Sequence, residues 1–240
     1  MLLLIKSEIA APFGLAMTAT KETQTLALAC HVAHNMLLYD FDDHYRSKGY
    51  AVVAGVDEAG RGPWAGPVVA AAVILPEIPH ISGLNDSKKL SPLQREKAFL
   101  EITSHAIAIG VEIINHDVID AVNIGVATYR AMQGAVARIG RCPDMVLIDG
   151  LPVPSIAGCQ ESIVAGDGKS ACIAAASIIA KVTRDRIMMD MGEKYPCYNF
   201  QKHKGYGTKE HRSALEKYGP CPIHRKSFEP IKSWGDAGNE

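Results

Sequence analysis

Four acidic residues stand where a carboxylate could do chemistry: Asp57, Glu58, Asp149 and Asp167. Asp57 and Asp149 each follow an apolar run typical of a buried strand, and Asp167 lies in GDGKS, just before a long apolar stretch. Because converging acids repel one another, divalent cations would stabilise such a cluster, and oxygen ligands with few histidines nearby suit Mg²⁺ or Mn²⁺. Two ions about 3.5–4 Å apart would hold the attacking and leaving oxygens of a phosphodiester. Taken singly, each acid could equally be a turn or capping residue.

Positive charge gathers in the C-terminal third of the sequence. Residues 180–232 contain 12 Lys and Arg against 6 Asp and Glu, whereas residues 51–179 contain 9 against 13. Within the basic part, the segment 195–211 (YPCYNFQKHKGYGTKEH) mixes lysines with aromatic residues, and Tyr206 between two glycines predicts an exposed turn. Lysines suit phosphates and aromatic rings suit bases or sugars, so the pattern is typical of a nucleic-acid surface. A solvated loop with core aromatic residues is the alternative.

The composition is that of a globular protein. The 240 residues are 48% hydrophobic and 21% charged with a net charge of −1, so we expect one large domain or two small ones. No apolar run approaches the roughly 18 residues of a membrane span, and Lys6 and Glu8 interrupt the apolar start, so we expect no membrane partner and no secretory signal. The six cysteines include no Cys-x-x-Cys pair, which speaks against a zinc site and favours reduced thiols in the cytoplasm.

The apolar pattern predicts an α/β domain with a mixed sheet. We expect strands over 51–56, 68–75, 107–114 and 145–149, the first two of them paired. A capping box starts a helix at Ser91, and Thr208 caps a last helix that ends at Tyr218. Small apolar residues predict a helix over 170–191 that is buried against the sheet. Other helices are expected within 36–50 and over 118–139, the latter broken near Gly125. Residues 1–35 are expected to form a loosely attached extension of unknown role.

Two glycine-containing segments resemble nucleotide-binding motifs and fail on spacing. The segment 60–65 (GRGPWA) fits the dinucleotide pattern G-x-G-x-x-A, but prolines and a further glycine at 63–67 break the helix that must open there. This speaks against a nicotinamide-dependent enzyme. GDGKS resembles a phosphate-binding loop, but the glycine required five residues before Gly168 is replaced by Ile163. We therefore reject both motifs.

Five segments together resemble the ribonuclease HII family, the type 2 ribonucleases H. In chain order they are AGVDEAGRGPWAGPVVAAAVI, LNDSKKLS, MVLIDG, GDGKSACIAAASIIAKVTRDR and YPCYNFQKHKGYGT. The resemblance implies a ribonuclease-H-like mixed sheet flanked by helices, with a basic helical C-terminal portion, over residues 36–232, followed by a tail at 233–240. The first 35 residues lie outside the resemblance and are too short for the additional domain of ribonuclease HIII.

The resemblance also implies an activity and a site. It implies metal-dependent cleavage of the RNA strand of RNA/DNA hybrids, and of single ribonucleotides embedded in duplex DNA, leaving 3′-hydroxyl and 5′-phosphate ends. We expect a monomer that uses Mg²⁺ or Mn²⁺. The alternative is a non-catalytic nucleic-acid-binding module of the same fold. The implied catalytic metal ligands are Asp57, Glu58, Asp149 and Asp167, and the implied substrate-binding residues are Gly60, Arg61, Gly62, Lys88, Lys89 and Tyr206.

The residues themselves sharpen two of these assignments. Glycines at 60 and 62 would let backbone amides approach a ribose 2′-hydroxyl, the group that separates RNA from DNA, and Arg61 would add charge. Asp185 also lies in a matching segment, but 18 residues along a continuous helix correspond to about 27 Å, too far for it to share a cluster with Asp167. Lys181 stands four residues before Asp185 and is placed to pair with it. Asp167 is therefore the expected fourth ligand.

Overall fold

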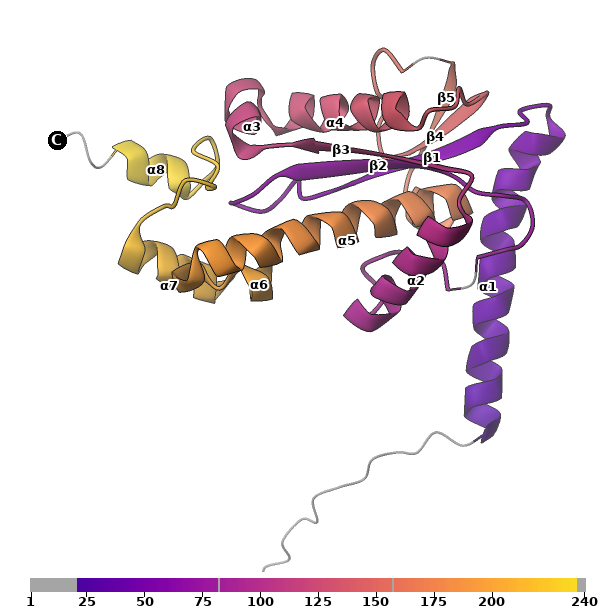
Figure 1. Cartoon of the computed structure of the whole chain (residues 1–240), viewed down its shortest axis with the longest axis horizontal. Coiled ribbons are helices and arrows are strands. Elements are labelled where there is room, and N and C mark those ends of the chain that lie inside the picture. The colour runs from indigo at the N-terminus through magenta and orange to yellow at the C-terminus, as the bar shows by residue number, and fades with distance from the viewer. Residues whose placement is uncertain (1–20, 82, 157, 237–240) are drawn as a thin grey trace, which may run out of the picture.

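A mixed five-stranded sheet forms the centre of the structure, a computed structural model that describes residues 21–81, 83–156 and 158–236 (Figure 1). The strands are β1 (Val53–Ala59), β2 (Val68–Ile74), β3 (Ala108–Ile114), β4 (Met145–Asp149) and β5 (Cys159–Ile163), in the order β3-β2-β1-β4-β5. β1, β2 and β3 are antiparallel neighbours, whereas β4 runs parallel to β1 and β5 parallel to β4. The four expected strands are confirmed. β5 was missed because it lies at an edge and its residues are mostly exposed or half-buried, which removes the apolar signal.

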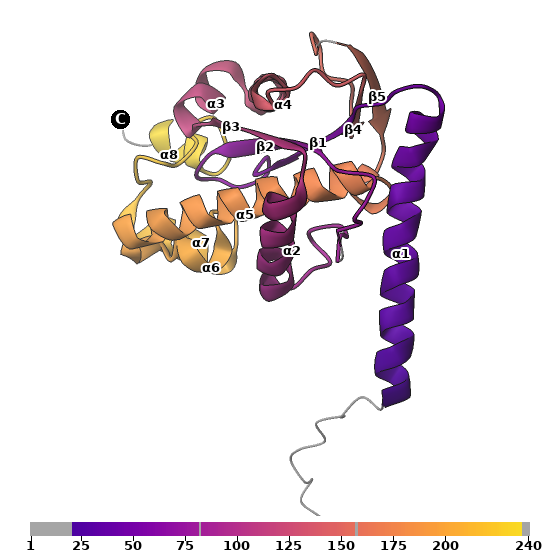
Figure 2. The same cartoon turned by 45° about the vertical axis from the view of Figure 1, so that its right-hand side comes forward.

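Helices cover both faces of the sheet (Figures 1 and 2). On one face lie α3 (His116–Val122) and α4 (Ile124–Arg138). On the other lie α5 (Ala171–Lys194) and α2 (Pro92–His105), with α1 (Lys21–Ser47) beside them. The expected burial of the small residues at the start of α5 is confirmed, since residues 171–180 are all buried. The helix lies so close to β1 that a Cβ on Gly55 would collide with the backbone of Cys172.

Local signals set most of the helix boundaries. The capping box at Ser91 and the cap at Thr208, which begins α7 (Lys209–Tyr218), are both present. The break in the 118–139 region falls at Asn123, whose φ of 69° no continuous helix allows, rather than at Gly125. α1 is longer than expected and already begins at Lys21, so the expected boundary after residue 35 falls inside it. Residues 1–20 of the expected extension lie outside the described residues.

The C-terminal part has its own core at the far end of α5. It contains a 3₁₀ turn (Pro196–Tyr198), α6 (Phe200–His203), α7 and α8 (Ile231–Asp236). Phe200 and Leu215 pack there against Met188 of α5. Within the described residues, no helix is long and apolar enough to cross a membrane.

Candidate active site

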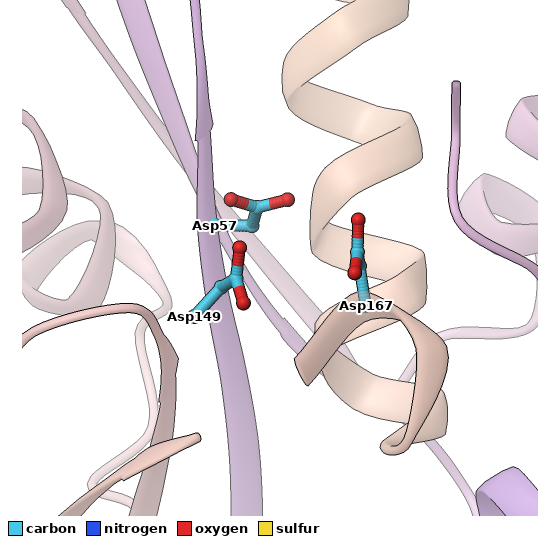
Figure 3. A group of neighbouring side chains, drawn as sticks. All are labelled: Asp57, Asp149 and Asp167. Atoms are coloured by element: carbon cyan, nitrogen blue, oxygen red, sulfur yellow. The ribbon is translucent and has the colours of Figure 1, made fainter. Parts of the chain in front are cut away.

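Three aspartates converge where the carboxyl end of the central strands meets the start of α5 (Figure 3). Val56 of β1 lies opposite Ile148 of the parallel strand β4, so Asp57 and Asp149 follow one residue later on neighbouring strands. Asp167 approaches from the other side, and one carboxylate oxygen of each aspartate lies within 4.8 Å of the others. Asp57 and Asp167 are each only 5% exposed. The sheet register therefore assembles three of the four expected ligands.

The turn that carries Asp167 is fastened at both ends. Asp167 lies in a 3₁₀ turn, Gly166–Gly168, directly before α5, and the N–H of Gly166 donates to Oδ1 of Asp149 at 2.7 Å. On the other side, Asp42 of α1 accepts hydrogen bonds from Ser170 Oγ at 2.6 Å and from Cys172 N at 2.9 Å. A carboxylate that binds free N–H groups stabilises a helix start. Asp42 thus caps α5 from another helix, a role that sequence reasoning missed because Ser170 is itself a sufficient N-cap.

The cluster concentrates negative charge in a buried place. Burial, followed by the charges of Glu58 and Asp149, raises the pKa of Asp57 well above its ordinary value. Burial also raises the pKa of Asp167, and the negative charges of Asp86 and Asp149 act in the same direction. Carboxyl groups whose pKa is raised in this way bind either protons or a divalent cation. The donor set consists of hard oxygens at cation-binding separation, so these residues fit Mg²⁺ or Mn²⁺.

Glu58 borders this group from the opposite face of β1. Successive strand residues point to opposite faces, so Glu58 and Asp57 cannot project to the same side. Glu58 pairs with Arg61 at 3.5 Å and, with Asp149, lines a cavity of about 90 Å³ beside α4. Burial is the main cause of its raised pKa, and the charge of Asp149 contributes. Glu58 is thus adjacent to Asp149 but outside the tight group of three.

The loop before α2 adds an acid that sequence reasoning did not single out. Asp86 lies beside Asp167 and contributes to the raised pKa of that residue, through its charge and through a side-chain hydrogen bond. Its Oδ1 also accepts from the N–H of Lys88 at 2.9 Å. Lys88 Nζ lies 3.7 Å from Asp167, so the structure brings it to the site. Lys89 is exposed, and no ion pair of its side chain is found among the described residues. The sequence feature that could have identified Asp86 is its position in the segment LNDSKKLS, two residues before Lys88.

The expected recognition loop and Tyr206 lie side by side. Gly62 and Arg61 are exposed, and a Cβ on Gly62 would still be 4.0 Å from the Tyr206 ring. Tyr206 is 42% exposed, with the guanidinium of Arg184 and the ammonium of Lys181 at 5.8 and 5.7 Å from its ring centre. Gly60, in contrast, is buried with φ +97°, and a Cβ there would collide with Arg184. The two glycines therefore differ: there is open space for a side chain at 62, whereas packing against Arg184 excludes one at 60.

A basic groove continues from Tyr206 between α2, α5 and α6. It has a volume of about 350 Å³, and Arg95, Lys181 and Lys204 are among its lining residues. The expected pair of Lys181 with Asp185 is present at 2.8 Å, and Asp185 lies in this groove rather than in the acidic group. The expectation that Asp185 serves another purpose is thus consistent with its place in the fold.

Comparisons with known proteins identify the family of the chain. The sequence profile of the ribonuclease HII family matches residues 54–231. The ribonuclease HII of Bacillus mycoides (strain KBAB4) is 56% identical over 192 residues, which cover 80% of this chain and 74% of that protein. The enzyme of Endomicrobium trichonymphae is 53% identical over 195 residues, or 81% of this chain and 93% of that protein. The crystal structure of the ribonuclease H2 from Pyrococcus horikoshii OT3 is similar, with a TM-score of 0.67, 27% identity and coverage of 78% and 98%. The chain belongs to the ribonuclease HII family.

Proposed function

We propose that this endoribonuclease cleaves the RNA strand of RNA/DNA hybrids, and also duplex DNA at single embedded ribonucleotides, leaving 3′-hydroxyl and 5′-phosphate ends. The observation that carries the proposal is the group of Asp57, Asp149 and Asp167, with carboxylate oxygens within 4.8 Å of one another. Hydrolysis of a phosphodiester needs charge neutralisation at the phosphate and an activated water. An acidic group of this kind is suited to hold the ions that provide both.

In this proposal the three aspartates hold Mg²⁺ or Mn²⁺, and Glu58 completes the ligand set from the other face of β1. When bound, the metal polarises the phosphate and lowers the pKa of water. The chain's own contribution is to fix the carboxylates. β1 and β4 are hydrogen-bonded neighbours, and the hydrogen bond from Gly166 N to Asp149 fastens the turn that carries Asp167. Lys88, at 3.7 Å from Asp167, is placed to contact a phosphate of the bound strand.

Recognition of the ribonucleotide is assigned to the exposed surface beside the acids. Tyr206 is placed to lie against a sugar, and the 60–62 loop to approach its 2′-hydroxyl. Arg61 and the lysines around Tyr206 supply sequence-independent attraction for phosphates. Lys89, which is exposed in the same loop as Lys88, belongs to this outer set. We further propose that the protein acts as a monomer in the cytoplasm on double-stranded nucleic acid.

One assay tests the proposal. A duplex DNA labelled at the 5′ end of the strand that contains one ribonucleotide is incubated with the protein and Mg²⁺, with Mn²⁺, or with a chelator. We expect one cut with each metal and none with the chelator, and product mobility should reveal a 3′-hydroxyl end. The same duplex without the ribonucleotide is the control and should stay intact. Binding of the ribonucleotide duplex without any cut in either metal would instead support the non-catalytic binding module.

A further inference from the structure

Two buried arginines lie beneath the 60–67 segment, and the proposed function assigns them no role. Arg225, which is 0% exposed, donates from Nε to Gly66 O at 3.0 Å, from Nη1 to Arg61 O at 2.9 Å and from Nη2 to Gly60 O at 2.6 Å. Arg184, also 0% exposed, donates to the carbonyls of residues 67, 65 and 204. Their guanidinium groups therefore bind the backbone of this segment from the inside.

Neither guanidinium forms an ion pair with a carboxylate among the described residues. A buried cation is costly unless its donors are satisfied. Here each guanidinium donates three hydrogen bonds to backbone carbonyls, and Nη1 of Arg184 is buried without a partner in the described part of the chain. Arginine can do this because its planar fork carries five N–H donors. The carbonyls of Gly60 and Arg61 consequently point into the protein, toward Arg225.

The inward carbonyls determine where the N–H groups point. In a trans peptide, the C=O of one residue and the N–H of the next point in opposite directions, and both peptides here are trans. The N–H groups of Arg61 and Gly62 therefore point away from Arg225, on two residues that are exposed. Neither donates to any group in the described part of the chain. Two adjacent N–H groups that both point outward can donate to an oxygen atom that carries negative charge or a lone pair.

We propose that Arg225 is a positioning residue for ribonucleotide recognition. Its guanidinium holds the carbonyls of Gly60 and Arg61 inward, so that the N–H groups of Arg61 and Gly62 are presented to the 2′-hydroxyl oxygen or adjacent phosphate of one ribonucleotide beside Tyr206. Arg184 supports the same surface, because it joins the carbonyls of residues 65 and 67 to that of Lys204 in the Tyr206 loop. This inference rests on the proposed function and assigns the shape of its recognition loop to the hydrogen bonds of Arg225.

The test compares Arg225→Lys with Leu215→Ala. Lysine keeps the charge but offers a single donor atom in place of the fork, whereas Leu215 is buried in the same C-terminal core and reports general destabilisation. For each, the dissociation constants for an all-DNA duplex and for the same duplex with one ribonucleotide are measured in an Asp149→Asn background, which prevents cleavage. Mn²⁺ affinity is measured with Asp149 intact.

The measure of discrimination is the dissociation constant for the all-DNA duplex divided by that for the duplex with one ribonucleotide. We expect Arg225→Lys to lower this ratio about tenfold and to leave Mn²⁺ affinity within about twofold of the wild type. Leu215→Ala should lower the melting temperature without changing the ratio. An unchanged ratio in Arg225→Lys, or an equal fall in Leu215→Ala, would overturn the inference. If Arg225→Lys does not fold, Gly62→Pro decides, because it removes one of the two N–H groups, and Leu215→Ala stays the control for destabilisation. The ratio must then fall with Gly62→Pro and not with Leu215→Ala.

The outcome is separable from that of the proposed function. A wild-type protein that binds the ribonucleotide duplex more tightly than DNA but does not cut it refutes the proposed cleavage and leaves the positioning role standing. A protein that cuts normally while Arg225→Lys retains full ribose discrimination refutes the positioning role alone.

Discussion

Charges of opposite sign are buried near the two ends of α5, and they are compensated in different ways. At its start, Asp57, Asp149 and Asp167 face one another, and burial with mutual repulsion raises the pKa of Asp57 well above its ordinary value. Toward its other end, Arg184 and Arg225 are fully buried, and burial lowers their pKa values to about 10 and about 9. The arginines are therefore still charged at neutral pH.

The difference lies in what compensates each charge. The arginines donate to backbone carbonyls of the protein itself, so their compensation is internal, although Nη1 of Arg184 has no partner among the described residues. The aspartates accept only a few internal hydrogen bonds, among them the one from Gly166 to Asp149, and the nearby ammonium of Lys88, 3.7 Å from Asp167, is on an exposed side chain. An incompletely compensated cluster of like charge is a candidate binding site, whereas a cluster compensated by the protein itself stabilises the fold. Four predictions test this contrast.

Asp149→Asn should have the largest effect and reduce cleavage by about a thousandfold or more. The amide retains the shape and can still accept the Gly166 N–H, but it lacks the charge that attracts a cation. Turnover on the single-ribonucleotide duplex and the melting temperature are measured together. We expect a melting temperature at or above that of the wild type, and duplex binding that is kept or increased, because repulsion is relieved. Near-normal turnover would remove Asp149 from the site.

Asp167→Asn and Asp185→Asn form a matched pair at the two ends of the contrast. Asp167→Asn should lower the cleavage rate by about a hundredfold or more and weaken Mn²⁺ binding. Asp185→Asn loses a half-buried ion pair with Lys181, which is worth less than about 1 kcal/mol, so a small fall in melting temperature is expected with nearly full activity. A folded but inactive Asp185→Asn beside an active Asp167→Asn would reverse the assignment.

Tyr206→Ala should reduce kcat/KM on a single embedded ribonucleotide by about tenfold, more than Lys209→Ala does. The tyrosine is half-exposed beside Gly62 and fixes position, whereas a lysine on a phosphate supplies salt-dependent affinity. The two variants are compared from low to high salt. The Lys209→Ala defect should change with salt, and the Tyr206→Ala defect should persist. A larger defect in Lys209→Ala at every salt concentration would contradict this.

The last prediction concerns stability alone, through its pH dependence in the C-terminal core. His211 Nε2 and His224 Nε2 lie 3.0 Å apart, and burial lowers the pKa of each to about 4. Since the unfolded chain binds these protons more readily, this contribution to stability is complete above about pH 6.5 and is lost as the pH falls toward 4.

The expected loss at pH 5 is about 2 kcal/mol for each histidine, on the order of 4 kcal/mol for the pair. Urea unfolding between pH 7 and 5 measures it. His224→Gln, which removes one partner, should show a shallower pH dependence than the wild type although it is less stable at pH 7. Parallel pH profiles for the two proteins would show that the histidines do not titrate on unfolding.

Much of the fold and of the acidic site could be predicted from local sequence. Hydrophobic periodicity and composition located four strands and the helix α5, and capping residues located the starts of α2 and α7, because these signals act between residues close in the chain. The acids at strand ends and the segment GDGKS were visible for the same reason. The resemblance to ribonuclease HII then named the activity, since its five segments carry most of the site.

Only the tertiary structure decided which groups satisfy one another. Asp42 caps a helix 128 residues away, and Arg225 binds carbonyls 159 to 165 residues away. Strand alternation set Glu58 apart from the three aspartates, and Arg184 explained why position 60 must be glycine. Sequence patterns reflect interactions between residues that are close in the chain. A buried charge is compensated by whichever groups the fold brings close to it. Because those partners are distant in the chain, they produce no periodic pattern in the sequence.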